Sequence, residues 1–210
     1  MGMNLLTVAV FASAALSGYL ISGINPAIIL SKAIYGKDIR ECGSKNPGFT
    51  NFKRTFGMKW AWVVLVCDLL KSALPSVIFG IIFESCFGAW SIGVTFTCLC
   101  SMIGHAYPVW YRFRGGKGFL VCLSAMWALD WRIGLIATAL MLVLLMLTKY
   151  MSLSTTLAML VCPILHLLFG GNVVSVSLCF ACVLIMVVRH KENYKRLVCG
   201  NESKFVLKKG

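Results

Sequence analysis

Three short polar segments interrupt an otherwise apolar chain, and each combines cations with glycine or with neutral hydrogen-bond donors. The first runs from Gly43 to Arg54 and reads GSKNPGFTNFKR. Gly48 lets backbone N–H groups turn toward an anion, while Ser44 and Asn51 add polar side chains. Arg54 carries a planar guanidinium that suits phosphate. We therefore predict an anion-binding loop; the alternative is a solvated loop whose charge only sets membrane topology.

The second segment joins GHAYP at 104–108 to RGGKG at 114–118. A lysine flanked by three glycines places a point charge on a backbone that a phosphate can approach closely. If a helix begins near this lysine, the dipole at its N-terminus adds affinity for an anion. The spacing differs from that of the P-loop, and a tight turn between two spans is the alternative interpretation. The residues are Lys117 with Gly115, Gly116 and Gly118.

The third segment, RHKENYKR at 189–196, directly follows an apolar stretch. On a continuing helix His190 and Asn193 share one face, because residues three apart are neighbours there. A basic run beside a membrane is otherwise an anchor for lipid headgroups. Ser152 and Thr155 place hydroxyls at the start of another apolar stretch, where helix capping is the alternative role.

Metal-dependent chemistry is not expected at these segments. The loops hold few carboxylates, namely Asp38, Glu41 and Glu192, which disfavours two-metal phosphoryl transfer. Histidine is scarce, and the cysteines lack ligand spacing and are expected to be buried thiols. We therefore predict no metal and no cofactor. Cations, glycines and neutral donors bind anions and stabilise anionic transition states without one.

The composition excludes a soluble domain. The chain has 210 residues, of which 59% are hydrophobic and 13% charged, and its mean hydropathy is +0.85. Soluble domains have about 45–50% apolar and about 25% charged residues. The apolar stretches predict an all-α integral membrane protein with seven transmembrane helices in one domain, residues 1–210. The segments are 1–31, 60–83, 85–111, 118–129, 133–148 and two within 150–188, separated by a turn at Gly170-Gly171-Asn172.

The fourth segment is short, and one helix across 118–148 is the competing interpretation. The net charge is +13, and the placement of the Lys and Arg residues decides between the two. With seven helices and the N-terminus outside, all but two of the 20 Lys and Arg residues fall on the cytoplasmic side. The exceptions are Lys71 and Arg132. Lys71 lies three residues after Asp68 inside the second segment, where they are expected to pair with each other or with facing helices; a role in the site is the alternative. We therefore expect a seven-helix bundle, N-terminus out and C-terminus in, with short, polar, glycine-rich cytoplasmic loops.

These three segments resemble the motifs of the bacterial acylphosphate-dependent glycerol-3-phosphate acyltransferases. The family patterns are close to G-S-G-N-[IP]-G-A-T-N-x-x-R, to G-H-x-[FY]-P-V followed by F-[KR]-G-G-K-G, and to H-x-[ED]-N-[IY]-x-R-L. All three occur here in order, and the resemblance covers nearly the whole chain. Two departures lie in the first motif, where Lys45 replaces the usual glycine and Phe49 the usual alanine.

The resemblance implies a multi-pass enzyme of the bacterial inner membrane whose active site faces the cytoplasm. Such an enzyme moves a fatty acyl group from acyl phosphate to the 1-hydroxyl of glycerol 3-phosphate, giving lysophosphatidic acid and phosphate. Its partners are these two small molecules and the lipid bilayer, with no nucleic acid; the sequence indicates no protein partner. A transporter or channel for an anionic solute is the alternative.

The resemblance also assigns residue roles. In the first motif Ser44 and Arg54 are phosphate contacts, and Asn51 is assigned with them to substrate binding. Lys117 bridges the phosphates of both substrates, helped by its three flanking glycines. His190 and Asn193 position the acyl phosphate or the attacking hydroxyl, while Ser152 and Thr155 lie near the donor. The general base is left open between His190 and a substrate phosphate.

Overall fold

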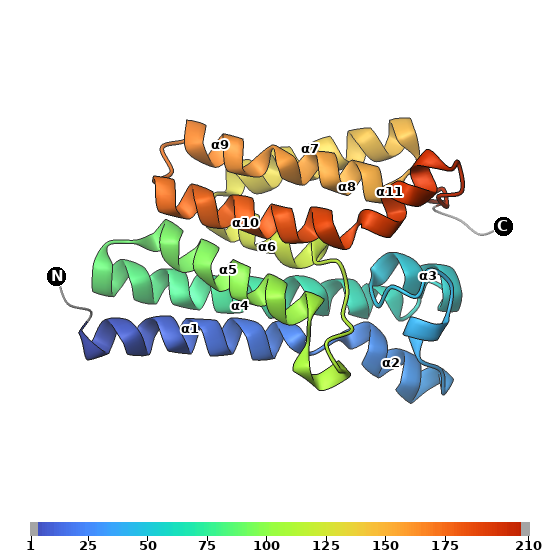
Figure 1. Cartoon of the computed structure of the whole chain (residues 1–210), viewed down its shortest axis with the longest axis horizontal. Coiled ribbons are helices and arrows are strands. Elements are labelled where there is room, and N and C mark those ends of the chain that lie inside the picture. Colours follow the sequence, from blue (N-terminus) through green and yellow to red (C-terminus); the bar gives the residue numbers. More distant parts are fainter. Residues whose placement is uncertain (1–3, 207–210) are drawn as a thin grey trace.

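The computed structural model describes residues 4–206, and all regular secondary structure in that range is helical. The long helices run side by side, with the start of α1 at one end and α3, α11 and the last described residues at the other (Figure 1). The α-helices are α1 Leu5–Gly23, α2 Pro26–Tyr35, α3 Phe49–Phe56, α4 Ala61–Phe87, α5 Trp90–Ala106, α6 Phe119–Leu129, α7 Trp131–Thr148, α8 Met151–Leu160, α9 Cys162–Leu168, α10 Val173–Arg189 and α11 Lys191–Val198; two short 3-10 helices are Ile39–Glu41 and Val109–Tyr111.

Five stretches are long and apolar enough to cross a membrane, and α10 with α11, bent by 53°, gives a sixth. The expectation of an all-α protein with many candidate spans is therefore confirmed. The remaining apolar helix, α6, has 11 residues and rises about 16 Å, well short of a bilayer core of about 30 Å. The five stretches are Leu5–Tyr35, Ala61–Phe87, Trp90–Tyr111, Trp131–Thr148 and Met151–Leu168.

The first apolar segment is broken, which the sequence analysis did not anticipate. Residues 1–3 of that segment lie outside the described residues. Helix α1 ends at Gly23, and Asn25 caps a new helix by accepting a hydrogen bond from the Ile28 N–H at 3.0 Å. Pro26 follows at the first helical position, where its missing N–H costs nothing but prevents α1 from continuing. The helix then runs to Tyr35, beyond the predicted end at residue 31.

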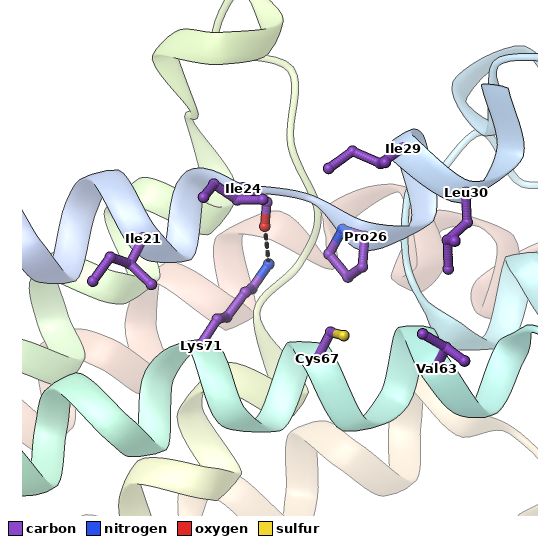
Figure 2. Close-up of a pocket in the computed structure, with 8 residues that line it drawn as sticks. All are labelled: Ile21, Ile24, Pro26, Ile29, Leu30, Val63, Cys67 and Lys71. Carbon is purple, nitrogen blue, oxygen red and sulfur yellow. Dashed lines mark hydrogen bonds between the residues drawn. The ribbon is translucent and has the colours of Figure 1, made fainter. Parts of the chain in front are cut away.

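The buried pair Asp68 and Lys71 supports this break. The Lys71 ammonium lies 2.8 Å from the Asp68 carboxylate, so the predicted pairing is confirmed. The ammonium also donates to the Ile24 carbonyl at 3.0 Å, which satisfies an acceptor that the broken helix leaves free (Figure 2). Beside it an apolar groove of about 320 Å³ lies between α4 and the junction of α1 with α2, lined largely by aliphatic side chains such as those of Pro26 and Val63.

The later turns fall where the sequence placed them. Asp130 is extended and caps α7 by accepting from the Arg132 N–H, so residues 118–148 do not form one helix. Asn172 caps α10 after the predicted turn at 170–172. The junction between the second and third segments differs slightly: α4 continues to Phe87 and α5 starts at Trp90.

Helix α5 is the centre of the bundle, because it packs against α1, α4, α6 and α10. One side of it faces a core built largely from α6 and α10, where five buried cysteines behave as the small hydrophobic groups expected of them. The other side meets α1 through glycines. A Cβ at Gly104 would overlap the Tyr19 carbonyl oxygen and lie 2.8 Å from the Tyr19 Cα. The two backbones are in contact there, as small residues allow between membrane helices.

We therefore expect Gly104→Ala to separate α1 from α5. The clash is with backbone atoms, which cannot rotate away, so the loss should exceed the gain in helix propensity and lower the free energy of unfolding by about 1–3 kcal/mol. Thermal unfolding in detergent measures this, with Cys86→Ala on the exposed side of α4 as the control. An unchanged midpoint in Gly104→Ala would contradict the close approach.

Candidate active site

All three polar segments meet at one pocket of about 240 Å³, at the end of the bundle that carries α3 and α11. Of the residues predicted for the site, Ser44, Gly115, Lys117 and Asn193 line it directly. These residues come from three segments that are far apart in the sequence, so their convergence is a property of the fold. The complete lining is Ser44, Lys45, Asn46, Tyr107, Gly115, Lys117, Val188, Arg189, Lys191, Glu192, Asn193 and Arg196.

The first loop is held in shape by Asn51. Its side chain, which is 2% exposed, accepts from the Ser44 N–H at 2.9 Å and donates to the Cys42 carbonyl at 3.0 Å. The amide of Asn25, at the break between α1 and α2, donates to the Pro47 carbonyl. Asn51 thus stabilises the loop through its backbone. Its contact with substrate stays a prediction. Arg54 lies in the last turn of α3, outside the pocket lining.

The turn at residues 115–118 before α6, called the glycine turn below, is fixed by backbone contacts. The Gly115 and Gly116 N–H groups donate to the carbonyls of Ala106 and His105, at 3.3 and 3.0 Å. Gly118 has a φ of +85°, a conformation that suits glycine, and α6 begins at the next residue. The predicted helix start beside Lys117 is therefore confirmed, and the unpaired N–H groups of the first turn of α6 add positive potential at this point.

A hydrogen-bonded network joins Lys117 to the last described residues. The Lys117 ammonium donates to the Asn193 side-chain oxygen. Asn193 donates to the Glu202 carboxylate at 2.6 Å, and Ser152 donates to the same oxygen at 2.9 Å. Arg196 holds the second carboxylate oxygen at 2.8 Å.

Glu202 was not predicted from the sequence, although a carboxylate in the basic tail was a usable signal. The Phe205 N–H donates to the Lys149 carbonyl at 2.7 Å, and the Lys53 ammonium donates to the Val206 carbonyl at 2.8 Å. The last described residues therefore connect α11 with α3 and with the junction of α7 and α8.

Two ionisable groups of the network have altered pKa values. Burial and the nearby positive charge of Arg196 lower the pKa of Lys117 to about 8. Burial alone would raise the pKa of Glu202, but the hydrogen bonds from Asn193, Arg196 and Ser152 outweigh it and hold the pKa below its usual value. At neutral pH the network therefore contains a protonated lysine and an ionised carboxylate, separated by a neutral amide.

The predicted residues His190, Ser152, Thr155, Gly116 and Gly118 are not part of the pocket lining. His190 is buried, and its Nδ1 lies 2.8 Å from the Met186 carbonyl. A carbonyl oxygen only accepts, so Nδ1 carries the proton and Nε2 has a free lone pair. The hydroxyl of Thr155 donates to the Met151 carbonyl of its own helix at 2.8 Å. Its contact with a substrate stays a prediction.

Arg189 binds the carbonyl groups of the glycine turn, whose N–H groups are bound by Ala106 and His105. Its guanidinium donates to the Gly116 carbonyl at 3.1 Å and to the Gly115 carbonyl at 2.9 Å, and lies over the Tyr107 ring. Carbonyl oxygens that faced the pocket would repel an anion. Because Arg189 binds both of them, the turn offers Lys117 and not its carbonyl groups to the pocket. Within residues 4–206 no three His, Cys, Asp or Glu side chains gather as a metal site would require.

The arrangement is similar to that of known proteins. The sequence profile described as glycerol-3-phosphate acyltransferase matches residues 12–200. A glycerol-3-phosphate acyltransferase of Legionella pneumophila (strain Corby) is 35% identical over 200 residues, covering 95% of this chain and 70% of the relative. The crystal structure of PlsY, an integral membrane glycerol 3-phosphate acyltransferase, in its glycerol 3-phosphate form has a TM-score of 0.86 and 30% identity, over 93% of this chain and 96% of that one. Its lysophosphatidic acid form has a TM-score of 0.82 and 28% identity, over 93% and 95%.

We expect Arg189→Lys to loosen the glycine turn. Lysine keeps the charge but lacks the planar pair of donors that binds two carbonyls at once. Hydrogen–deuterium exchange of the peptide covering 112–118 should become faster, and unfolding should cost about 1–3 kcal/mol less. Arg132→Lys, at the opposite end of the bundle, is the matched control and should leave that peptide unchanged. Equal exchange in wild type and Arg189→Lys would refute the role of Arg189 at the turn.

Proposed function

Because this chain belongs to the glycerol-3-phosphate acyltransferase family, we propose that it acylates the 1-hydroxyl of glycerol 3-phosphate with a fatty acyl phosphate as the donor. The products are then lysophosphatidic acid and phosphate. The observation that carries the proposal is the single pocket at which Ser44, Lys117 and Asn193 meet, each from a different polar segment. The lining is rich in cations and neutral donors, as a site for two phosphate-bearing molecules requires.

The chemistry needs little beyond charge and placement. Acyl phosphate is a mixed anhydride, so it is already activated and a covalent enzyme intermediate is unnecessary. The difficulty is that both substrates are anions and repel each other. Lys117, with the charge of Arg54 close enough to act on it, offsets that repulsion, and correct placement of the two reactants removes about 7–11 kcal/mol of barrier.

The reaction is balanced within the pocket. The acceptor hydroxyl oxygen attacks the carbonyl carbon, the bond from that carbon to the phosphate oxygen breaks, and phosphate leaves. Lys117 and Asn193 stabilise the charge that develops on the oxyanion and on the leaving phosphate. The hydroxyl proton goes either to His190 Nε2, whose lone pair the Met186 contact leaves free, or to a substrate phosphate.

Glu202 acts as a positioning residue in this proposal. It receives hydrogen bonds from Asn193 and Ser152, so it orients both side chains and turns the Asn193 oxygen toward Lys117. We also assign Asn51 and Arg189 to positioning, the first for the Ser44 loop and the second for the glycine turn.

We further propose seven membrane segments, with α6 as the short one, the N-terminus outside and the pocket at the cytoplasmic face of the bacterial inner membrane. The distribution of lysine and arginine favours this orientation. A transporter is the less favoured alternative, because transporters place their site near the bilayer midplane between structural repeats. Here the polar segments gather at one end of the bundle.

We expect Lys117→Ala and Arg54→Ala each to abolish most acyl transfer while the protein still inserts into the membrane. The measurement is phosphate release from palmitoyl phosphate with and without glycerol 3-phosphate. Lys37→Ala, an exposed lysine outside the pocket lining, serves as the control and should keep full activity. Near wild-type turnover in either site variant would refute the assignment of that residue to phosphate binding. If wild type releases no phosphate, acyl phosphate is not the donor.

The pKa of Lys117 predicts a pH dependence. The charged lysine is fully present below about pH 8 and is lost as the pH rises through that value. Since kcat/KM reports the free enzyme, it should fall above about pH 8. In Lys117→Arg the guanidinium stays charged, so the decline should move to higher pH even if the rate is lower. A decline at the same pH in both proteins would rule out Lys117 as its source.

A further inference from the structure

Lys45 has a backbone conformation that favours glycine. Its φ is +60°, in the left-handed region, and its N–H closes a turn onto the Cys42 carbonyl at 2.9 Å. Gly43, two residues earlier, has a φ of +55° and the residue type that this region suits. The chain therefore keeps a lysine where a glycine would fold at lower cost.

The position of Lys45 is fixed by the loop around it. The Ser44 N–H is bound to the Asn51 side chain, and the Pro47 carbonyl is bound to the Asn25 amide. Both anchors are buried side chains, at 2% and 1% exposure. Lys45 itself is exposed and lines the pocket from this rigid loop. The backbone of Lys45 is therefore held beside the pocket by contacts that other residues make.

The cations around Lys45 add electrostatic repulsion to the cost of its backbone conformation. Four of the five other charged residues of the lining are cations, and the one carboxylate lies 3.4 Å from Lys195. Over residues 4–206 Lys45 makes no ion pair of its own. An unpaired cation among cations repels its neighbours until an anion arrives. The other charged residues are Lys117, Arg189, Lys191, Arg196 and Glu192.

We propose that Lys45 is a substrate-capture residue of this chain, which binds the phosphate dianion of a substrate at the pocket mouth. This inference rests on the proposed function, because both substrates there carry such a phosphate. The like-charge repulsion among the cations of the pocket lining is offset when the dianion enters. A cation at the surface acts over a screened distance, so its contribution belongs to substrate capture and not to the chemical step.

The test separates charge from backbone strain with two variants. Lys45→Gln removes the charge and keeps the strained backbone, whereas Lys45→Gly removes both. We expect each to raise KM for one substrate about two- to fivefold with kcat unchanged, the scale of an exposed ion contact. The substrate whose KM rises, glycerol 3-phosphate or palmitoyl phosphate, identifies the bound phosphate. The decline of kcat/KM with added salt should be weaker in both variants than in wild type.

Stability gives an independent readout. Lys45→Gly should raise the thermal midpoint in detergent, because glycine relieves the strain, while Lys45→Gln should leave it near that of wild type. Lys37→Gln is the control for loss of a nearby exposed lysine and should change neither KM nor the salt dependence. Unchanged KM and salt dependence in both Lys45 variants would overturn the proposal.

Failure of the proposed function is distinguishable from failure of this inference. If wild type transfers no acyl group, equilibrium binding of glycerol 3-phosphate and of palmitoyl phosphate by wild type and Lys45→Gln still compares the two proteins. Weaker binding of either substrate by the variant supports capture by Lys45, and equal or absent binding of both substrates overturns it.

Discussion

The hydrogen-bonded chain from Lys117 through Asn193 to Glu202 is the interaction on which the basic end of this protein depends. Lys117 and Asn193 are 76 positions apart, and their contact fixes the glycine turn against α11. The like charges of Lys117 and Arg196 would otherwise push these segments apart. Glu202 offsets that repulsion, yet it meets Lys117 only through a neutral amide. The lysine is therefore held in place without being neutralised, and its charge remains available to an incoming anion.

The bundle supplies the rigid frame that this network needs. Lipid tails are as apolar as aliphatic side chains, so close packing must hold membrane helices together. Helix α5 achieves this with glycines, above all Gly104, whose backbone touches that of Tyr19. The residue after Gly104, His105, accepts the Gly116 N–H through its carbonyl. Packing in the bundle and the shape of the site turn are thus connected through two adjacent residues.

Local signals were sufficient for much of the fold and for part of the site. The break at Asp130, the helix start after Gly118 and the Asp68–Lys71 pair each depend on neighbours in the chain, and the sequence predicted all three. The end of α1 could also have been found, since Asn25 and Pro26 are a standard helix start, but the absence of charge over 1–31 suggested one continuous helix.

The site residues that sequence reasoning missed or left undecided depend on distant partners. Asn51 looks like one more polar residue of a loop until its contact with the Ser44 N–H is known. Arg189 resembles any basic residue beside a membrane, and only the fold shows that it binds the two glycine carbonyls. Glu202 lies beyond the last motif, and its three donors come from two separate helices. Such contacts join residues that no local pattern relates.

The contacts made by residues 202–206 have a practical consequence for handling the protein. A truncation after residue 200 would leave every helix intact and still remove the carboxylate that orients Asn193 and the backbone groups bound by Lys53 and Lys149. An affinity tag or fluorescent label is better attached at the start of α1, because that end lies across the bundle from α11 (Figure 1), whose residues line the pocket.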